Sequence, residues 1–245
     1  MRNVLTIAGK EFKSYFVSPM AYAVICFMAL VGGLVFALMT TASPGGSEAS
    51  LRNFTGTVVF LLILMSPVVT MRLFAEEKSS GTLEILMSSP VKEYEVVLGK
   101  YLAGLGFYGV VLVTTLEFPI IITAITHSTS NQWPEMWPMV VSYLGWILCG
   151  SAFLSMGLLA STLTRSQLAA AIVALLILLL FWLIGWLAQA QSGVYADVLR
   201  QLSIHEHMSE FEKGVVGLKD VVYFLSVIVF FLFASVRAIE STRWR

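Results

Sequence analysis

Three side chains late in the sequence have the types and spacing of metal ligands. His205, His207 and Glu210 lie within six residues, in the loop before the last apolar segment. Imidazole nitrogens and a carboxylate together suit zinc and related transition metals. The alternative is that they are polar residues at the end of a surface helix. Because no CxxC pair or other metal-spaced set accompanies them, we favour the surface helix and predict no metal site.

Gly104, Gly106 and Gly109 have the GxGxxG spacing of a dinucleotide-binding loop. They fall inside an apolar segment with no strand before them, so we interpret them as sites of close helix approach. The sequence contains no GxxxxGK[ST] phosphate-binding loop and no Ser–His pair within an apolar segment, as an intramembrane protease would need. We therefore expect no catalytic residue in this chain, and we exclude a stand-alone ATPase.

Glu117 is the one carboxylate clearly within an apolar segment. Because a carboxylate is costly to bury in hydrocarbon, we expect Glu117 to face the protein interior or a wet cavity. Pro119 leaves the carbonyl of Thr115 without its helical partner and predicts a local bend. One interpretation places Glu117 and Thr114 on a pathway for a cation, proton or substrate. The other is a carboxylic acid hydrogen-bonded to Thr114 or to a neighbouring helix.

The elements that must position these residues are membrane-spanning helices. The chain is 58% hydrophobic and only 12% charged, with a mean hydropathy of +0.84, which is too apolar for a soluble domain of 245 residues. Its net charge of zero gives no indication of a nucleic-acid partner. Apolar segments of about 20 residues, long enough to cross ~30 Å of hydrocarbon as helices, are Pro19 to Met39, Phe54 to Leu73, Tyr101 to Ile125, Trp137 to Leu163, Leu168 to Ala188 and Val221 to Ala238. The sequence thus predicts an all-α integral membrane protein with six transmembrane helices and one domain over residues 1–245.

The basic residues predict the orientation of these spans. Six spans put both termini on one side, and 11 of the 15 Lys and Arg residues lie on that side: Arg2, Lys10, Lys13, Arg72, Lys78, Lys92, Lys100, Arg165, Arg237, Arg243 and Arg245. The opposite side has only Arg52, Arg200, Lys213 and Lys219. By the positive-inside rule, the N- and C-termini and residues 74–100 are cytoplasmic.

Residues 1–17 predict an amphipathic helix that lies in the inner membrane interface. Val4, Ala8, Phe12 and Phe16 fall on one helical face, flanked by Leu5, Ile7 and Tyr15, whereas Arg2, Asn3, Thr6, Lys10 and Lys13 fall on the other. The alternative is a frayed basic tail that only sets the orientation.

Residues 74–100 form the one charge-dense stretch between two spans. Glu76, Glu77 and Lys78 follow the second span, and Ser80, Gly81 and Thr82 predict a helix break before a short new helix. Leu83, Leu86 and Met87 give that helix an apolar face, Glu84 lies beside it, and Pro90 ends it. Such a helix fits a groove on a partner protein. The alternative is a solvated loop whose charges only mark the cytoplasmic side.

These residues resemble a known family. The run EEKSSGTLEILMSSPV from Glu76 to Val91, followed by Leu98-Gly99-Lys100-Tyr101, looks like the signature loop of ABC-2 type transporter permeases. The end of the chain is similar to the gliding-motility-associated and nitrous-oxide-reductase-maturation branch, through His207, Phe211 and residues 213–216 and 218–226. Met208 and Gly217 depart from that branch, which often has an aromatic and an acidic residue there. The resemblance covers nearly the whole chain.

The resemblance implies a non-catalytic permease subunit of an ATP-binding cassette transporter in a bacterial cytoplasmic (inner) membrane, working in export. Separate ATPase subunits would bind ATP and Mg²⁺, and a second copy or a homologous permease would complete a dimer in the lipid bilayer. Residues 189–220 would form short extracytoplasmic helices. The coupling helix would lie within Gly81 to Pro90, and the ATPase-coupling residues would be Glu76, Glu77, Gly81, Thr82, Leu83, Glu84, Leu86, Met87 and Pro90.

Two other functions are compatible with the residues. An ion-coupled secondary transporter would use Glu117, and it predicts polar residues or interrupted helices at matching positions of two halves. Alternatively, the chain is a membrane subunit that transmits ATP-driven force to an accessory periplasmic or membrane protein and moves no substrate. The loops are too short for a substrate-binding domain, so specificity would reside in the spans or in another subunit.

Overall fold

The computed structural model describes residues 2–42, 51–83, 91–130, 136–190 and 194–243, and every regular element in these ranges is a helix. Within them, six helical stretches are long and apolar enough to cross a membrane. This confirms the predicted all-α integral membrane fold. The stretches are Pro19–Leu38, Phe54–Ser79, Glu93–Ile121, Met136–Leu163, Gln167–Leu187 and Leu218–Ser241.

Two of these stretches are not single helices. The second comprises α3 (Leu51–Thr70), a turn, and the short α4 (Ala75–Ser79). The third begins earlier than the apolar segment predicted from Tyr101 and is divided into α6 (Glu93–Thr114) and α7 (Glu117–Ser130). The other helices are α1 (Arg2–Val17), α2 (Pro19–Ala42), α8 (Met136–Leu163), α9 (Gln167–Ala190), α10 (Val194–Leu202), α11 (Ile204–Glu212) and α12 (Leu218–Arg243).

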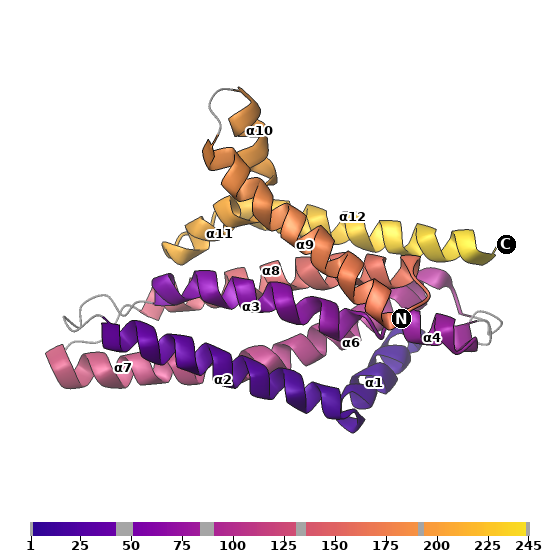
Figure 1. Cartoon of the computed structure of the whole chain (residues 1–245), viewed down its shortest axis with the longest axis horizontal. Helices are drawn as coiled ribbons and strands as arrows, with labels where there is room; N and C mark the ends of the chain where they lie inside the picture. Colours follow the sequence, from indigo (N-terminus) through magenta and orange to yellow (C-terminus); the bar gives the residue numbers. More distant parts are fainter. Residues whose placement is uncertain (1, 43–50, 84–90, 131–135, 191–193, 244–245) are drawn as a thin grey trace.

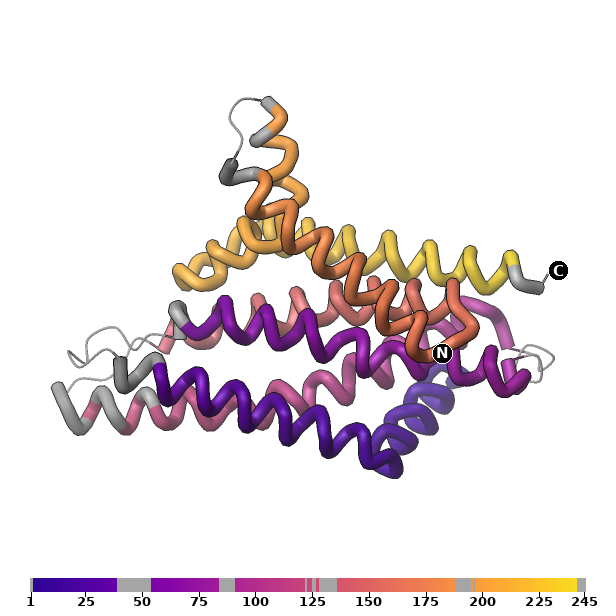
Figure 2. Tube along the Cα trace, viewed as in Figure 1, coloured from indigo at the N-terminus to yellow at the C-terminus, as the bar shows by residue number. Residues whose placement is uncertain are grey.

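The two termini and α4 lie at the same end of the helix bundle, which we call the termini end (Figure 1). There α1 packs against the first half of α6. The helix α9 starts near this end and leaves the bundle obliquely, so that α10 projects from the body of the molecule (Figure 2). The helices α10 and α11, which connect α9 to α12, occupy the segment expected to contain short helices.

The most buried span is α8, which contacts α3, α6, α9, α11 and α12. Small residues allow this crowding, as expected for helix packing in a bilayer. A Cβ atom at Gly157 would overlap the Thr70 hydroxyl of α3, and one at Gly150 would overlap the Tyr108 ring of α6. The Tyr108 hydroxyl donates to the carbonyl of Trp146, 2.6 Å away, so this close approach also carries a hydrogen bond.

Glycines on α6 likewise allow α1 to approach closely. A Cβ at Gly99 would meet Ile7, and one at Gly106 would meet Phe12. Of the GxGxxG glycines, Gly106 therefore allows the expected close approach, whereas nothing lies within 4 Å of a Cβ at Gly109. The predicted apolar face of α1 is the face turned toward α6, except that Leu5 is 68% exposed.

The division between α6 and α7 confirms the bend predicted from Pro119. The chain forms a turn at Thr115 and Leu116, and the Thr115 carbonyl accepts a hydrogen bond from the Phe118 amide at 3.1 Å. It also accepts one from the Tyr143 hydroxyl of α8 at 2.8 Å. Because an unpaired carbonyl is costly away from water, Tyr143 compensates for the donor that proline lacks.

The close contact between α8 and α3 predicts that replacing Gly157 with alanine lowers thermal stability, whereas the same replacement of Gly109 does not. We expect Gly157→Ala to lower the thermal unfolding midpoint of the detergent-purified protein, because overpacking costs about 1–3 kcal/mol. The matched variant Gly109→Ala adds its methyl group in open space and should leave the midpoint unchanged or slightly higher. Adding Thr70→Ala to Gly157→Ala should recover part of the loss. Equal midpoints for the two alanine variants would contradict the observed packing.

Candidate functional site

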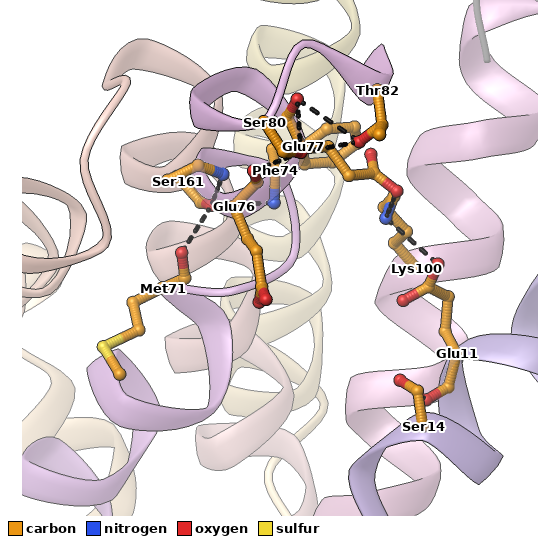
Figure 3. A network of polar contacts seen from close by, with 11 residues as sticks. Glu11, Ser14, Met71, Phe74, Glu76, Glu77, Ser80, Thr82, Lys100 and Ser161 are labelled. Carbon is orange, nitrogen blue, oxygen red and sulfur yellow. Dashed lines mark hydrogen bonds and ion pairs between the residues drawn. The ribbon is translucent and has the colours of Figure 1, made fainter. Parts of the chain in front are cut away.

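The start of the 74–100 segment is fixed to α8 by one hydroxyl. After α3 ends, the Ser161 Oγ atom of α8 accepts hydrogen bonds from the Phe74 and Ala75 amides, both at 3.0 Å. The same hydroxyl donates to the Met71 carbonyl at 3.3 Å (Figure 3). The first turn of α4 has no side-chain cap of its own, so a residue 86 positions away in sequence replaces it.

Lys100 is the centre of this region. Its side chain is 1% exposed, and its ammonium lies 2.8 Å from a Glu77 oxygen of α4 and 3.2 Å from a Glu11 oxygen of α1 (Figure 3). It also lies 5.2 Å from the centroid of the Phe74 ring, within cation–π range. One buried cation on α6 therefore holds α1 and α4 together.

Further polar contacts reinforce both connections. Lys78 of α4 donates to the Thr162 carbonyl of α8. On α1, Tyr15 donates to the Val69 carbonyl of α3 at 3.0 Å. Burial raises the pKa of the Tyr15 hydroxyl above its ordinary value, so this group stays protonated and remains a donor. Together these bonds attach α4 to α8 and α1 to α3.

The residues after the C-terminal end of α4 show why this helix ends at Ser79. Gly81 has a φ of +73°, in the left-handed region that glycine adopts without strain. The Ser80 and Thr82 hydroxyls are 2.9 Å apart, and Ser80 also donates to the Glu76 carbonyl. Thr82 and Leu83 are helical, with Leu83 buried.

Several predicted coupling residues cannot be placed in this arrangement. Glu84, Leu86, Met87 and Pro90 lie outside the described residues. The short helix expected between Gly81 and Pro90 stays a prediction beyond Leu83.

Glu117 is exposed on the surface of the chain, so its side chain does not face the interior of this chain. The other expectation, that it faces a wet cavity, stays a prediction, as does its place on a pathway. Glu117 begins α7 directly after the break, so the turn at Thr115 and Leu116 directs it outward rather than along the buried face of α6. The hydroxyl of Thr114 is not its partner either, since it donates to the Val111 carbonyl at 2.7 Å.

The three side chains with metal-ligand types serve separate purposes. His207 is buried, with Nδ1 at 2.6 Å from an Asp220 oxygen and Nε2 at 3.0 Å from the Gln201 carbonyl. Its ring stacks on Tyr223. Glu210 pairs with Lys213 at 2.7 Å, and His205 is exposed. Within the described ranges, no three His, Cys, Asp or Glu side chains are grouped as metal ligands would be.

Sequence reasoning missed the residues that hold this region together. Lys100 served as a charge that sets orientation and as part of the family resemblance, but not as a buried ion-pair partner, while Glu11 and Ser161 were given no role at the loop. Glu11 did leave a signal, because it lies at helical spacing with Val4, Ala8 and Tyr15 on the otherwise apolar face of α1. An acidic residue in that position indicates a buried cation nearby. Ser161 gave no such signal, since serine is common in closely packed helices.

The sequence model of one protein family, described as ABC-2 family transporter protein, matches residues 5–238. The match covers α1 from residue 5 onward, the first five membrane-spanning stretches, the sixth as far as residue 238, and the whole of the 74–100 segment. A search of curated proteins found no match.

The burial of Lys100 predicts a large effect of neutralising it. We expect Lys100→Met to destabilise the protein by about 3–5 kcal/mol, because removing one member of a buried ion pair leaves its partners unpaired. The matched control is Lys92→Met, at an exposed lysine that begins the same helix. Thermal unfolding of both purified variants should separate them clearly. A Lys100→Met variant as stable as Lys92→Met would show that the ammonium is not buried between the two carboxylates.

The cap on α4 predicts a difference between two buried serines of α8. We expect Ser161→Ala to cost about 1–3 kcal/mol for each buried amide left without an acceptor. The control Ser155→Ala removes an equally buried hydroxyl that bonds only within α8, to the Ala152 carbonyl. Limited proteolysis of the 74–100 segment should therefore accelerate in Ser161→Ala alone. Equal cleavage rates in the two variants would argue against the cap.

Proposed function

This chain belongs to the ABC-2 family of transporter proteins, and we propose that it is the permease subunit of an ATP-binding cassette transporter. Separate ATPase subunits bind ATP and Mg²⁺ and hydrolyse ATP, while this chain contributes no catalytic residue. It resides in a bacterial cytoplasmic membrane with its termini and residues 74–100 in the cytoplasm. It works in the export of a substrate.

The observation that carries this proposal is the ion cluster of Lys100, Glu77 and Glu11. A partner that presses on the segment from Gly81 to Pro90 moves α4, and α4 is tied to α6 and α1 through Lys100. The Ser161 bonds tie the start of α4 to α8. Helices are stiff along their axes, so a displacement at the loop is passed to α1 and to the spans α6 and α8 rather than lost in a flexible connection.

We also propose that a second copy or a homologous permease completes the transporter. The support is Glu117, which lies on the exposed surface of the stretch Glu93–Ile121. A carboxylate in a membrane-spanning stretch is favoured when it faces protein or water rather than lipid. A second membrane subunit against this face would provide either environment, and would place Glu117 and Thr114 beside a pathway between subunits.

We assign the chain to the gliding-motility-associated and nitrous-oxide-reductase-maturation branch of the family. The residues that carry this resemblance contact one another near the start of α12. His207 pairs with Asp220, and Phe211 is fully buried beside Phe224. We further propose that an accessory periplasmic or membrane protein receives the motion.

One observation favours the ion-coupled alternative, namely the interruption between α6 and α7 with an exposed carboxylate beside it. An ion-coupled transporter built from repeats would have a matching interruption in its second half. Within the described residues of that half, α9 and α12 each run without a break through their spans. The unmatched interruption makes the ATPase-coupled function the better supported of the two.

The docking function of the 74–100 segment can be tested by co-purification from native membranes. We expect wild-type protein to retain an ATPase subunit. The double variant Glu84→Arg, Leu86→Asp should retain at least about tenfold less of that subunit. The physical reason is that the variant reverses a charge and places a carboxylate on the apolar face that enters the partner's groove. Mass spectrometry of the eluates identifies the subunits and any accessory protein.

A matched double variant controls for charge and hydropathy. Glu206→Arg, Val198→Asp makes the same charge reversal and a similar aliphatic-to-carboxylate change at exposed positions of α11 and α10, and should leave ATPase retention unchanged. If wild type retains no ATPase while the membrane dimer stays intact, the ion-coupled function using Glu117 replaces this proposal.

A further inference from the structure

A cavity of about 510 Å³ lies at the elbow between α1 and α2, next to the turn that follows α3. Its volume is in the range of about 300–1,000 Å³ that is usual for small-molecule sites. The polar lining consists of Glu11, Ser14 and Ser18 from the elbow and Arg72 and Glu76 from the turn and α4. Neither Lys100 nor Ser161 lines it, and Glu11 is the lining residue that also pairs with Lys100.

An apolar crevice adjoins this cavity. The two share Tyr15, Ser18 and Arg72, and beyond those residues the crevice is lined almost entirely by apolar side chains of α2, α3 and α6. Met20, Ala21 and Val24 follow the first turns of α2 into its span. A polar chamber at the end of a span, continued by an apolar crevice along that span, is complementary to an amphiphile rather than to a water-soluble solute.

The charged residues that line the cavity favour one class of amphiphile over others. Arg72 is the one cation among the lining residues, and Glu11 and Glu76 are carboxylates. The guanidinium is half-buried, donates to the Ser18 hydroxyl at 2.5 Å and lies 3.3 Å from Glu76. A planar guanidinium beside hydroxyl groups suits a phosphate, and the carboxylates suit an ammonium. Glu11 is paired with Lys100, whereas the partner of Glu76 is Arg72 itself. An anionic headgroup that takes Arg72 and brings no amine would therefore leave Glu76 facing negative charge.

We propose that this cavity is a binding site for a zwitterionic aminophospholipid. The phosphate accepts hydrogen bonds from Arg72 and from Ser14 or Ser18, and the primary ammonium pairs with Glu76. The crevice, at about 10 Å³, is too small for an acyl chain. The glycerol therefore lies at its mouth beside Met20, and the acyl chains lie along the exposed apolar face of α2, which includes Leu30 and Leu34. The lipid is a resident ligand that wedges the elbow between α1 and α2 against the turn after α3.

The test is native mass spectrometry of the detergent-purified full chain after titration with phosphatidylethanolamine or with phosphatidylglycerol of identical acyl chains. We expect the first lipid to be retained at least about tenfold more than the second. The same titration with glycerophosphoethanolamine, which has the headgroup but no acyl chains, should give no bound species. Binding of all three probes alike, or of both lipids alike, would overturn the proposal.

Two tryptophan variants locate the site. Ser14→Trp fills the chamber from an exposed position of α1 and should reduce retention of phosphatidylethanolamine at least about tenfold. Thr6→Trp is the matched control, because Thr6 is also exposed on α1 and also donates to a carbonyl of its own helix, but does not line the cavity. Equal thermal unfolding midpoints show that both variants are folded. Equal lipid retention in the two variants would place any bound lipid elsewhere and refute the site.

Discussion

The arrangement at the termini end depends on keeping one ammonium group out of water. Transferring a charged amine into a protein interior costs several kcal/mol unless close, well-oriented partners compensate. Lys100 has two such partners and an aromatic ring, and each comes from a different element. If either carboxylate moved away, the buried Lys100 ammonium would lose part of the compensation for its desolvation. The two ion pairs therefore hold α1 and α4 at defined positions on α6. The amphipathic N-terminal helix is therefore a packed part of the bundle.

A second constraint is the pairing of backbone groups where a spanning stretch is interrupted. Hydrocarbon provides no water, so a broken helix must find hydrogen-bond partners in the protein. Both interruptions described above find theirs on α8, where Ser161 accepts from the amides that begin α4 and Tyr143 donates to Thr115. The two interruptions lie near opposite ends of α8, whose small residues let the neighbouring helices approach. The same helix is thus the packing centre and the source of the polar groups that make the breaks tolerable.

The sequence predicted the features that depend on neighbouring residues alone. Apolar length is a local property, so the six spans and the all-helical fold followed from it. The bend followed from a local cause too, because Pro119 lacks a backbone donor. The partners of Lys100 did not, because Glu11 is 89 positions away and nothing in the local pattern specifies which helices meet. The exposure of Glu117 on the surface of the chain was not predicted for a related reason. Pro119 predicted a bend but not its effect on the direction of the neighbouring side chains, and the turn at Thr115 and Leu116 changes the direction in which the next residues point.

The elbow cavity and the ion cluster are not independent, because Glu11 contributes to both. Its carboxylate lines the cavity and pairs with Lys100. Glu76 and Glu77 are neighbours on the short α4, and one faces the cavity while the other binds Lys100. A displacement of α4 by a partner must therefore alter the cavity, and an occupant of the cavity must alter the energy of displacing α4. Thermodynamic linkage requires these two effects to be equal. If both proposals hold, the lipid at the elbow and the ATPase at the loop act on the same mechanical element, and the surrounding membrane becomes a regulator of coupling rather than only its solvent.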